Sequence, residues 1–385
     1  MDIYSRLMES NGNQPIHHSI AQSIHELAQI GLTDEGGSNR IAGSESEIFS
    51  REWLKNKMLA VGMEVIEHSQ SIYGYYPGED DNLPAIMLGS HLDTVKNGGH
   101  FDGTIGVLLP LIYVEQLNSQ KKKIKHPIII CSFYDEEGVI TGVGLEGSRK
   151  FQKDYNKKCK PFQKSIETFI EIHIEQGPVL ELYQKPLGLV SSIVGSFALE
   201  VTFDGISGHA GTVPMALRKD PLICFCEWAS KIKQFILPFG EEAKVTIGRI
   251  EMLPNVTNVI PNQVKAQLDI RHVKLEQLKE MVATLIAEAK VTAARHGIKI
   301  ASNAQIVQTP QFLDREILRK VNSDNQLPIL VSGALHDSAI ISEIIPTLLI
   351  FVRSRGGISH TPEEWTTLND LVEAYEFMKN FLKDW

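Results

Sequence analysis

The chain has 385 residues, of which 43% are hydrophobic and 22% are charged, and its formal net charge is −9. A chain of this length has more residues than a single hydrophobic core usually accommodates, so we expect a globular protein with two domains. The negative net charge argues against binding to nucleic acid. The longest apolar runs are too short to span a membrane, so we expect neither nucleic acid nor a membrane as a partner. Four cysteines are too few for a disulfide framework, and the first residues lack a signal-peptide pattern. We therefore expect a cytoplasmic protein.

Strand and helix patterns alternate along the first half of the chain. A capping-box pattern at residues 44–47 precedes apolar residues at helical spacing. The Ile-rich runs predict buried strands, and helical segments lie between them: strands at 85–88, 128–133 and 169–174, helices at 104–117 and 141–151. This alternation predicts an α/β domain whose sheet is covered by helices on both faces.

The middle of the chain follows a different order of elements. The patterns predict a strand at 199–203, a helix at 214–236, strands at 245–253 and 264–270, a helix at 274–296 and a strand at 298–307. The order βαββαβ is that of a ferredoxin-like unit. We therefore expect an inserted domain at residues 195–304.

The α/β pattern resumes after this insertion. Buried strands are predicted at 328–331 and 347–352, and Asn369 is expected to cap a final amphipathic helix. The first domain, with a central mixed sheet, would then comprise residues 1–194 and 305–385.

Imidazoles and carboxylates gather just after the predicted strands of the first domain. They are His91 with Asp93, Asp102, the acidic run Asp135-Glu136-Glu137, His173 and His360. Sites in open α/β sheets lie at the carboxyl ends of strands. Three adjacent acids repel one another unless a cation is present, so Glu137 is a candidate ligand and Glu136 a candidate base. Together these residues indicate a dinuclear metal site for hydrolysis.

Each of these residues also has a structural interpretation when it is taken alone. His91, His173 and His360 could be histidines whose hydrogen bonds are satisfied in the core or in a loop. Asp102 could cap the helix that follows it. The acidic run could be an exposed loop, so the metal site depends on the coincidence of several motifs.

The predicted insertion carries three further polar candidates. His209 lies among small residues and could approach a substrate closely, or it could belong to a glycine-rich turn. Asn258 lies in the same domain. Arg271 could bind a carboxylate through two hydrogen bonds, or it could form an ion pair at the surface.

These residues lie in strings that resemble the bacterial amidohydrolases that include N-carbamoyl-L-amino acid hydrolase, allantoate amidohydrolase and β-ureidopropionase. That group belongs to the superfamily of aminoacylases and dinuclear zinc carboxypeptidases. The resemblance extends from about Gly36 to Leu382. The matching strings include Gly-Ser-His-Leu-Asp-Thr-Val (89–95), Asn-Gly-Gly-His-Phe-Asp-Gly (97–103), Glu-Glu-Gly (136–138), His-Ile-Glu-Gln-Gly (173–177), His-Ala-Gly-Thr (209–212), Asn-Val-Ile-Pro (258–261), Asp-Ile-Arg (269–271) and Gly-Ile-Ser-His (357–360).

The resemblance implies a role for each residue and two divalent metal ions per subunit. His91 and His173 would bind one ion, Glu137 and His360 the other, and Asp102 would bridge them. The ions would be zinc, with manganese, cobalt and nickel accepted by the same ligand types. Among the remaining residues, Glu136 would be the general base, Asp93 would support His91, and the substrate would be bound by Gln176, His209, Asn258 and Arg271. The inserted domain would act as a lid and form a homodimer.

The activity implied is hydrolysis of a linear C–N bond in a small N-carbamoyl or ureido acid, such as allantoate, that carries a carboxylate. A metal-bridging hydroxide would be the nucleophile. An aminoacylase or dipeptidase of the same superfamily and a ligand-binding homologue without catalysis remain alternatives. Three departures from the family pattern affect the substrate more than the metal site: Leu335 replaces a glycine, Arg353 replaces a proline, and the segment at 150–167 is short.

Overall fold

The computed structural model describes residues 2–9, 14–140, 142–157, 161–323 and 325–385. The chain divides into two compact units. Unit 1 comprises Met1–Ser191 and Phe312–Trp385, and unit 2 comprises Ser192–Gln311. No helix among the described residues is long and apolar enough to cross a membrane.

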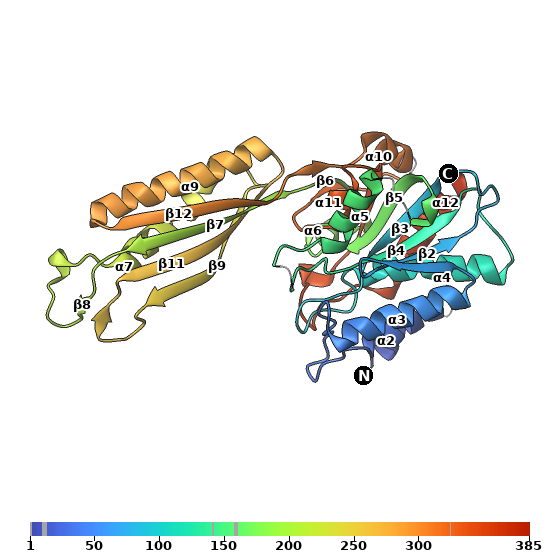
Figure 1. Cartoon of the computed structure of the whole chain (residues 1–385), viewed down its shortest axis with the longest axis horizontal. Helices are drawn as coiled ribbons and strands as arrows, with labels where there is room; N and C mark the ends of the chain where they lie inside the picture. The colour runs from blue at the N-terminus through green and yellow to red at the C-terminus, as the bar shows by residue number, and fades with distance from the viewer. Residues whose placement is uncertain (1, 10–13, 141, 158–160, 324) are drawn as a thin grey trace. The chain divides into compact units, whose positions relative to one another are not determined.

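Nine strands in the described residues form one mixed sheet at the centre of unit 1 (Figure 1). They are β1 (Glu64–His68), β2 (Ser71–Tyr76), β3 (Ala85–His91), β4 (Ile128–Phe133), β5 (Ile166–Ile174), β6 (Leu187–Ile193), β13 (Gln311–Phe312), β14 (Ile329–Ser332) and β15 (Thr347–Val352). The order is β1-β2-β4-β3-β5-β15-β6-β13, and β14 pairs with β6. The predicted α/β fold with a central mixed sheet is confirmed.

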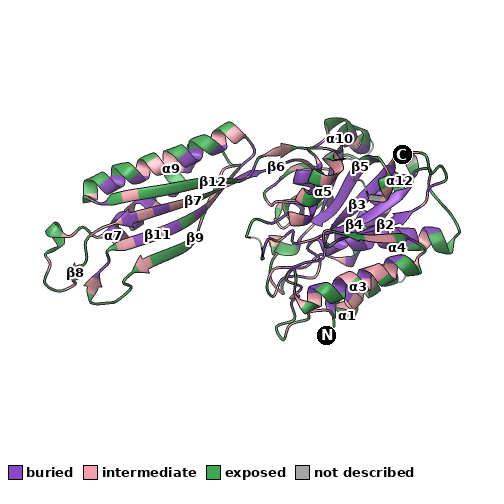
Figure 2. Ribbon diagram, in the orientation of Figure 1, coloured by how far each residue is buried: buried purple, intermediate pink, exposed green. Residues whose placement is uncertain are grey.

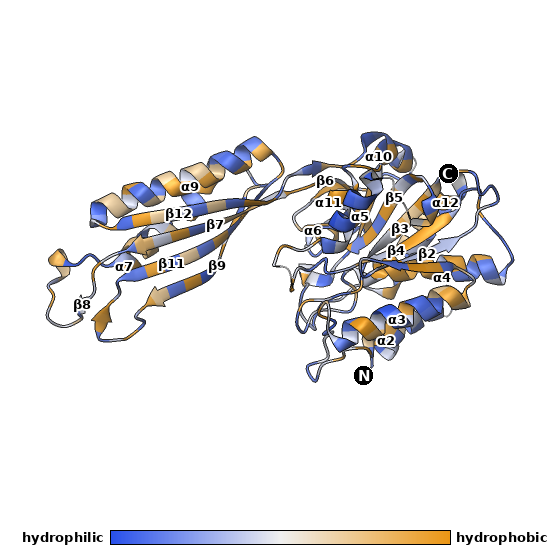
Figure 3. Cartoon of the chain, viewed as in Figure 1, coloured by the Kyte–Doolittle hydropathy of each residue, from blue (hydrophilic) through white to orange (hydrophobic). Residues whose placement is uncertain are grey.

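The four central strands are parallel, so their carboxyl ends share one edge of the sheet. β3 pairs in parallel with both β4 and β5, and β15 pairs in parallel with β5. β3, β4 and β15 are buried along their whole length (Figure 2). Because both faces of the sheet are covered, the sequences of these strands are mostly apolar and do not alternate with polar residues. The ribbons around the labels β3 and β4 accordingly carry much orange in Figure 3.

Helices cover both faces of this sheet. On one face, Leu88 of β3 packs in a cluster with α1 (Ile3–Met8), α2 (Pro15–Ala28), α3 (Glu45–Ala60), α4 (Thr104–Ser119), α10 (Arg315–Asn322) and α12 (Leu368–Asp384). On the other face, Met87 packs in a cluster with α5 (Glu146–Asn156) and α11 (Asp337–Ile341). The remaining short helices are η1 (Pro161–Gln163), α6 (Val179–Leu182) and η4 (Arg355–Gly357).

Helix caps decide where several of these helices begin. The Ser44 side chain accepts a hydrogen bond from the Glu47 backbone N–H, as the capping-box pattern predicts. The expected cap at Asn369 is wrong. The final helix begins at Leu368, because the Thr367 side chain accepts from the Asp370 N–H and stands at the N-cap position.

Unit 2 contains a four-stranded antiparallel sheet with the order β12-β7-β11-β9. Its elements are β7 (Gly195–Asp204), β8 (Gly208–His209), η2 (Met215–Leu217), α7 (Pro221–Ser230), α8 (Ile232–Ile236), η3 (Leu237–Phe239), β9 (Lys244–Leu253), β10 (Val259–Ile260), β11 (Gln263–His272), α9 (Leu275–His296) and β12 (Lys299–Gln308). Apolar residues of α7, α8 and α9 share one cluster with β7 and β11, including the fully buried Trp228.

A single helix at 214–236 is not formed. Residues 215–217 make one 3-10 turn, and α7 starts only at Pro221. A residue before proline disfavours helical backbone, whereas proline itself fits the first helical position. The Asp220 side chain accepts from the Leu222 and Ile223 N–H groups, and this N-cap fixes the start of α7 there.

Candidate metal centre

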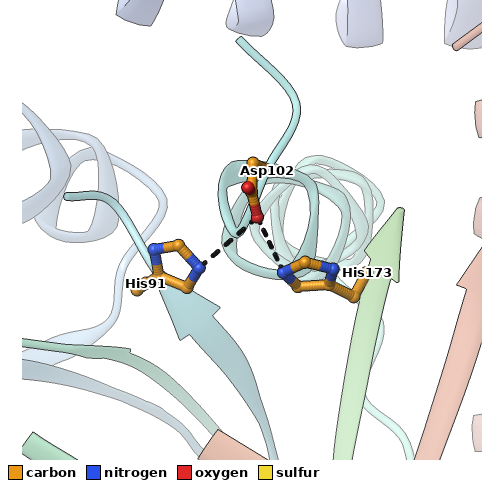
Figure 4. A group of neighbouring side chains, drawn as sticks. All are labelled: His91, Asp102 and His173. Atoms are coloured by element: carbon orange, nitrogen blue, oxygen red, sulfur yellow. Dashed lines mark ion pairs between the residues drawn. The ribbon is translucent and has the colours of Figure 1, made fainter. Parts of the chain in front are cut away.

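Two histidines and one aspartate meet at the carboxyl edge of the parallel strands (Figure 4). His91 is the last residue of β3, and His173 lies near the end of β5. Asp102 belongs to the loop before α4. Its Oδ1 atom lies 2.9 Å from His173 Nε2 and 3.7 Å from His91 Nε2. All three side chains are buried, with His91 only 1% exposed.

A second group shares the same aspartate. Oδ2 of Asp102 lies 3.1 Å from His360 Nε2, and that nitrogen is 3.5 Å from Glu137 Oε2. In each group the potential ligand atoms lie within 4.8 Å of one another. Asp102 therefore offers one oxygen to each group, which is the arrangement expected of a carboxylate between two metal ions.

Backbone carbonyls turn the two buried imidazoles toward Asp102. His91 Nδ1 is 3.0 Å from the Asp93 carbonyl oxygen, and His173 Nδ1 is 2.8 Å from the Ile174 carbonyl oxygen. If each Nδ1 donates, each Nε2 carries a free lone pair. Within the described residues, the buried Nε2 of His91 makes no hydrogen bond, so it is available to a metal ion.

The carboxylate of Asp93 lies between His91 and the acidic loop. It lies 3.7 Å from His91 Nδ1, while its oxygens accept from the backbone N–H groups of Glu136 and Glu137 at 3.3 and 3.2 Å. Burial raises the pKa of Asp93 to about 7, against the lowering effect of these two bonds. Asp93 thus holds the acidic loop in place, and its carbonyl oxygen is nearer to His91 Nδ1 than its carboxylate is.

The acidic loop places Glu136 and Glu137 differently. Glu136 Oε2 lies 3.5 Å from His91 Nε2, whereas Glu137 approaches His360. Burial and the charge of Glu137 raise the pKa of Glu136 well above its usual range, and burial and the charge of Asp102 raise that of Glu137 to about 8. A divalent cation would relieve this clustering of negative charge.

The shared aspartate has the opposite shift. Burial opposes ionisation of Asp102, but hydrogen bonds from His173 and His360 outweigh it and hold its pKa well below the usual range. Burial also disfavours the charged form of His173, yet Asp102 raises the pKa of that imidazole to about 9. Without a metal ion, the contact with Asp102 therefore favours the protonated form of His173.

Several backbone positions at the site are left-handed, including Gly103, Gln176 and His360. Gly103 has a φ of 66°, and a Cβ atom there would lie 2.4 Å from His91 Nε2. His360 has a φ of 60°, which is uncommon for a residue with a side chain. Such strain occurs where the surrounding structure fixes a functional group.

Gln176 joins the second group. Its Nε2 atom donates to Asp102 Oδ2 at 2.8 Å and to Ser359 Oγ at 3.1 Å, and it lies 3.2 Å from His360 Nε2. The side-chain amide of Gln176, which we expect to bind substrate, thus lies beside the carboxylate of Asp102.

The other three expected substrate residues belong to unit 2. His209 is exposed on β8, which pairs with β10, and the Asn258 carbonyl oxygen accepts from the Ala210 N–H at 3.0 Å. Arg271 is the residue before the last of β11 and makes two hydrogen bonds to the Asp269 carboxylate, at 2.7 and 3.0 Å. His209 and Asn258 are therefore neighbours on one two-stranded ribbon.

The departures from the family pattern lie within unit 1. Arg353 makes two-pronged contacts with the Asp370 carboxylate of α12, the shortest at 2.8 Å, so it is held by a structural ion pair. Leu335 is half-buried directly before His336, whose ring centroid lies 4.4 Å from that of His173. Part of the short 150–167 segment, residues 158–160, falls outside the described residues.

Sequence reasoning missed Glu364, which is 1% exposed behind the shared aspartate. Its carboxylate accepts from the backbone N–H groups of Phe101 and Asp102 and from the Ser359 hydroxyl. Burial and the Asp102 charge raise its pKa to about 7. Its position four residues after His360 was the only signal, because the groups it contacts are backbone atoms far away in the sequence.

Comparisons with known proteins agree with this geometry. A model of peptidase family M20/M25/M40 matches residues 87–384. The N-carbamoyl-L-amino-acid amidohydrolase of Pseudomonas sp. (strain NS671) is 32% identical over 91% of this chain and 93% of that protein. The allantoate amidohydrolase of Bacillus subtilis (strain 168) is 31% identical over 92% and 94%.

The same relationship appears among solved structures. An amidase of the hydantoinase/carbamoylase family from Burkholderia multivorans is 26% identical with a TM-score of 0.86, covering 96% of this chain and 97% of that one. The M20 family is metal-dependent, in keeping with the two ligand groups. The resemblance to N-carbamoyl-L-amino acid and allantoate amidohydrolases is confirmed, and the chain belongs to peptidase family M20/M25/M40.

Proposed function

We propose that this protein hydrolyses a linear C–N bond in an N-carbamoyl amino acid or an allantoate-like ureido acid. The observation that carries the proposal is Asp102, whose two oxygens face two separate ligand groups while Glu136 stays outside both. The names of the amidohydrolase relatives support the ureido class of substrate.

The donor set suits two divalent ions. His91, Asp102 and His173 would hold one, and Asp102, Glu137 and His360 the other. Mixed imidazole and carboxylate ligands accept zinc, manganese, cobalt or nickel, and we propose zinc. Ions bound there would act as Lewis acids on the substrate carbonyl and make a water molecule acidic at neutral pH.

Glu136 would perform the proton transfers. Its carboxylate would take a proton from the attacking water and deliver it to the leaving nitrogen. For a carbamoyl substrate, water adds to the carbamoyl carbon and the bond from that carbon to the amino-acid nitrogen breaks, which releases the amino acid and carbamic acid. Carbamic acid then decomposes to carbon dioxide and ammonia. Asp93 would keep Glu136 in place through the hydrogen bond to its backbone N–H.

Unit 2 would complete the substrate site. Its βαββαβ order and antiparallel sheet support a ferredoxin-like domain, which we propose acts as lid and dimerisation domain. Arg271 would bind the substrate carboxylate, whereas His209, Asn258 and Gln176 would bind its polar end. The free thiols of Cys131, Cys224 and Cys226 support a reducing, cytoplasmic location.

The test is ammonia release from a panel of substrates by metal-depleted protein to which zinc, manganese or cobalt is returned. The panel contains N-carbamoyl-L-amino acids, β-ureidopropionate and allantoate, with N-acetyl amino acids and a dipeptide assayed for amine release. We expect metal-dependent turnover of a ureido compound. Glu136→Gln should lower kcat by about 10²–10⁴-fold with both ions retained, because a general base contributes that much.

Glu137→Gln is the matched variant, because it removes a negative charge from the adjacent residue. Since Glu137 is a proposed metal ligand, this variant should bind the second ion more weakly, whereas Glu136→Gln should keep both ions. Turnover of the acetyl compounds or the dipeptide alone would refute the ureido substrate. Metal binding without any turnover would refute catalysis.

A further inference from the structure

Glu364 occupies the space directly behind the shared aspartate. Its Oε1 atom accepts two backbone hydrogen bonds, from Phe101 at 3.0 Å and from Asp102 at 3.1 Å. The carboxylate fits closely against the backbone of this loop, because a Cβ atom on Gly99 would lie 2.0 Å from Glu364 Cδ. The loop that carries Asp102 is therefore anchored to a residue 263 positions after Phe101.

The second oxygen of Glu364 reaches the other ligand loop. Oε2 accepts from the Ser359 hydroxyl at 2.8 Å, and Ser359 directly precedes His360. The His360 side chain is 47% exposed, and its backbone is left-handed. The side chains of the other proposed ligands are at most 8% exposed, so His360 depends most on a tether to keep its place.

A single hydroxyl proton links this tether to the shared carboxylate. Ser359 Oγ lies 2.8 Å from Glu364 Oε2 and 3.3 Å from Asp102 Oδ2, and both oxygens are acceptors. The proton can be donated to only one of them at a time. Donation to Glu364 removes one of the donors that compete with a metal ion for Asp102 Oδ2, which also accepts from Gln176 Nε2.

We propose that Glu364 is a positioning residue for the second metal ion: it ties the Asp102 loop to the His360 loop and draws the Ser359 proton away from Asp102. This inference rests on the proposed function only for the presence of two ions. A carboxylate is required because three donors converge on it. An amide offers one acceptor, and its NH₂ group would turn the Ser359 proton toward Asp102.

The test measures metal binding before activity. Metal-depleted wild type, Glu364→Gln and Glu363→Gln are titrated with zinc and with cobalt by competition with a chelating dye. Glu363 is exposed and adjacent, so Glu363→Gln removes the same charge without breaking the tether. We expect Glu364→Gln to weaken the second ion at least tenfold, to change the first less, and to leave Glu363→Gln like the wild type.

Ser359→Ala covers the case in which Glu364→Gln does not fold. It breaks the tether at the other end while the Phe101 and Asp102 bonds remain, so it should also weaken the second ion. Glu364→Asp, one methylene shorter, should recover part of the affinity. In turnover, kcat at limiting metal should fall while KM stays the same, and excess metal should restore kcat.

Two outcomes overturn the proposal: wild-type affinity for both ions in folded Glu364→Gln or Ser359→Ala, or a wild-type chain that binds fewer than two ions. Failure of the proposed function has a different signature, which is full metal binding by the wild type without hydrolysis of any ureido compound. The metal titration still decides the role of Glu364 in that case.

Discussion

Asp102 and His173 are in hydrogen-bond contact, with 2.9 Å between Oδ1 and Nε2, although they stand on different elements of the sheet edge. In the metal-free protein this contact supplies part of the charge balance that an ion would otherwise provide. A metal ion bound by these two side chains would replace this contact.

Metal should raise thermal stability. A ligand that binds only the folded state stabilises it by about 2.7 kcal/mol at a concentration 100 times its Kd. For a unit of this size each kcal/mol shifts Tm by about 2–4 °C, so saturating zinc should raise Tm by roughly 5–10 °C. Asp102→Asn should abolish the increase, because both ligand groups lose their shared carboxylate. An equal increase in this variant, measured by calorimetry, would place the ions elsewhere.

Gly103→Ala should destabilise the protein and impair metal binding. The left-handed backbone costs an alanine about 1–2 kcal/mol, and its Cβ would also press on His91 Nε2. Gly36→Ala is the control, since Gly36 has a φ of 84° but no atom within 4 Å of its would-be Cβ. Denaturant unfolding should show a cost in both variants and a metal defect only in Gly103→Ala. Normal metal affinity in Gly103→Ala would contradict the proposed position of the first ion.

Acid should remove a stabilising contribution of Glu227 in unit 2. Hydrogen bonds from His296, Lys231 and Arg295, in that order, lower the pKa of Glu227 to about 2. Because the folded pKa lies below the usual value of 4.5, the contribution is present above pH 4.5 and is lost as the pH falls toward 2.

Thermal melts across this range provide the measurement. Glu227→Gln should be less stable than the wild type near pH 6, and the difference should shrink between pH 4.5 and 2. Glu276→Gln, which removes an acid paired with Lys279 at the surface, should differ little from the wild type. A Glu227→Gln difference that is constant with pH would show that packing, not charge, is responsible.

Arg353 should affect stability rather than substrate choice. Its partner Asp370 is 3% exposed, so Arg353→Ala leaves a buried carboxylate without its cation. Breaking a buried pair costs about 3–5 kcal/mol, and the partial exposure of Arg353 reduces the expected loss to roughly 1–3 kcal/mol. Arg353→Ala with Asp370→Asn should recover part of it. A changed ranking of the substrate panel would instead place Arg353 at the substrate.

The sequence predicted elements best where hydrophobicity alone defines them. The strands expected at 128–133 and 347–352 have the observed limits, since each is a continuous buried run. Other predictions were wrong because a neighbouring residue takes the N-cap position. Thr367, not Asn369, caps the final helix, and Asp220 with Pro221 starts a new helix where a continuous one was expected.

The candidate site was predictable in residue types but not in contacts. His91 and His173 lie at or near the carboxyl ends of their strands, and Asp102 precedes a helix. Such positions converge at the carboxyl edge of a parallel sheet. The contact made by the Asp93 carboxylate was not predictable, because its partners are backbone N–H groups of the acidic loop. Glu364 was missed for the same reason: a sequence does not reveal which distant peptide groups a buried acid will contact.

The chain enters and leaves unit 2 at neighbouring places. β6 and β13 are adjacent strands of the unit 1 sheet, and the Leu313 N–H donates to the Ser191 carbonyl at 3.0 Å where the two segments meet. Every proposed metal ligand lies outside the segment between them. The inserted segment thus has closely spaced ends. Its sequence can diverge, or be exchanged for that of a relative, without interrupting any strand that carries a proposed ligand.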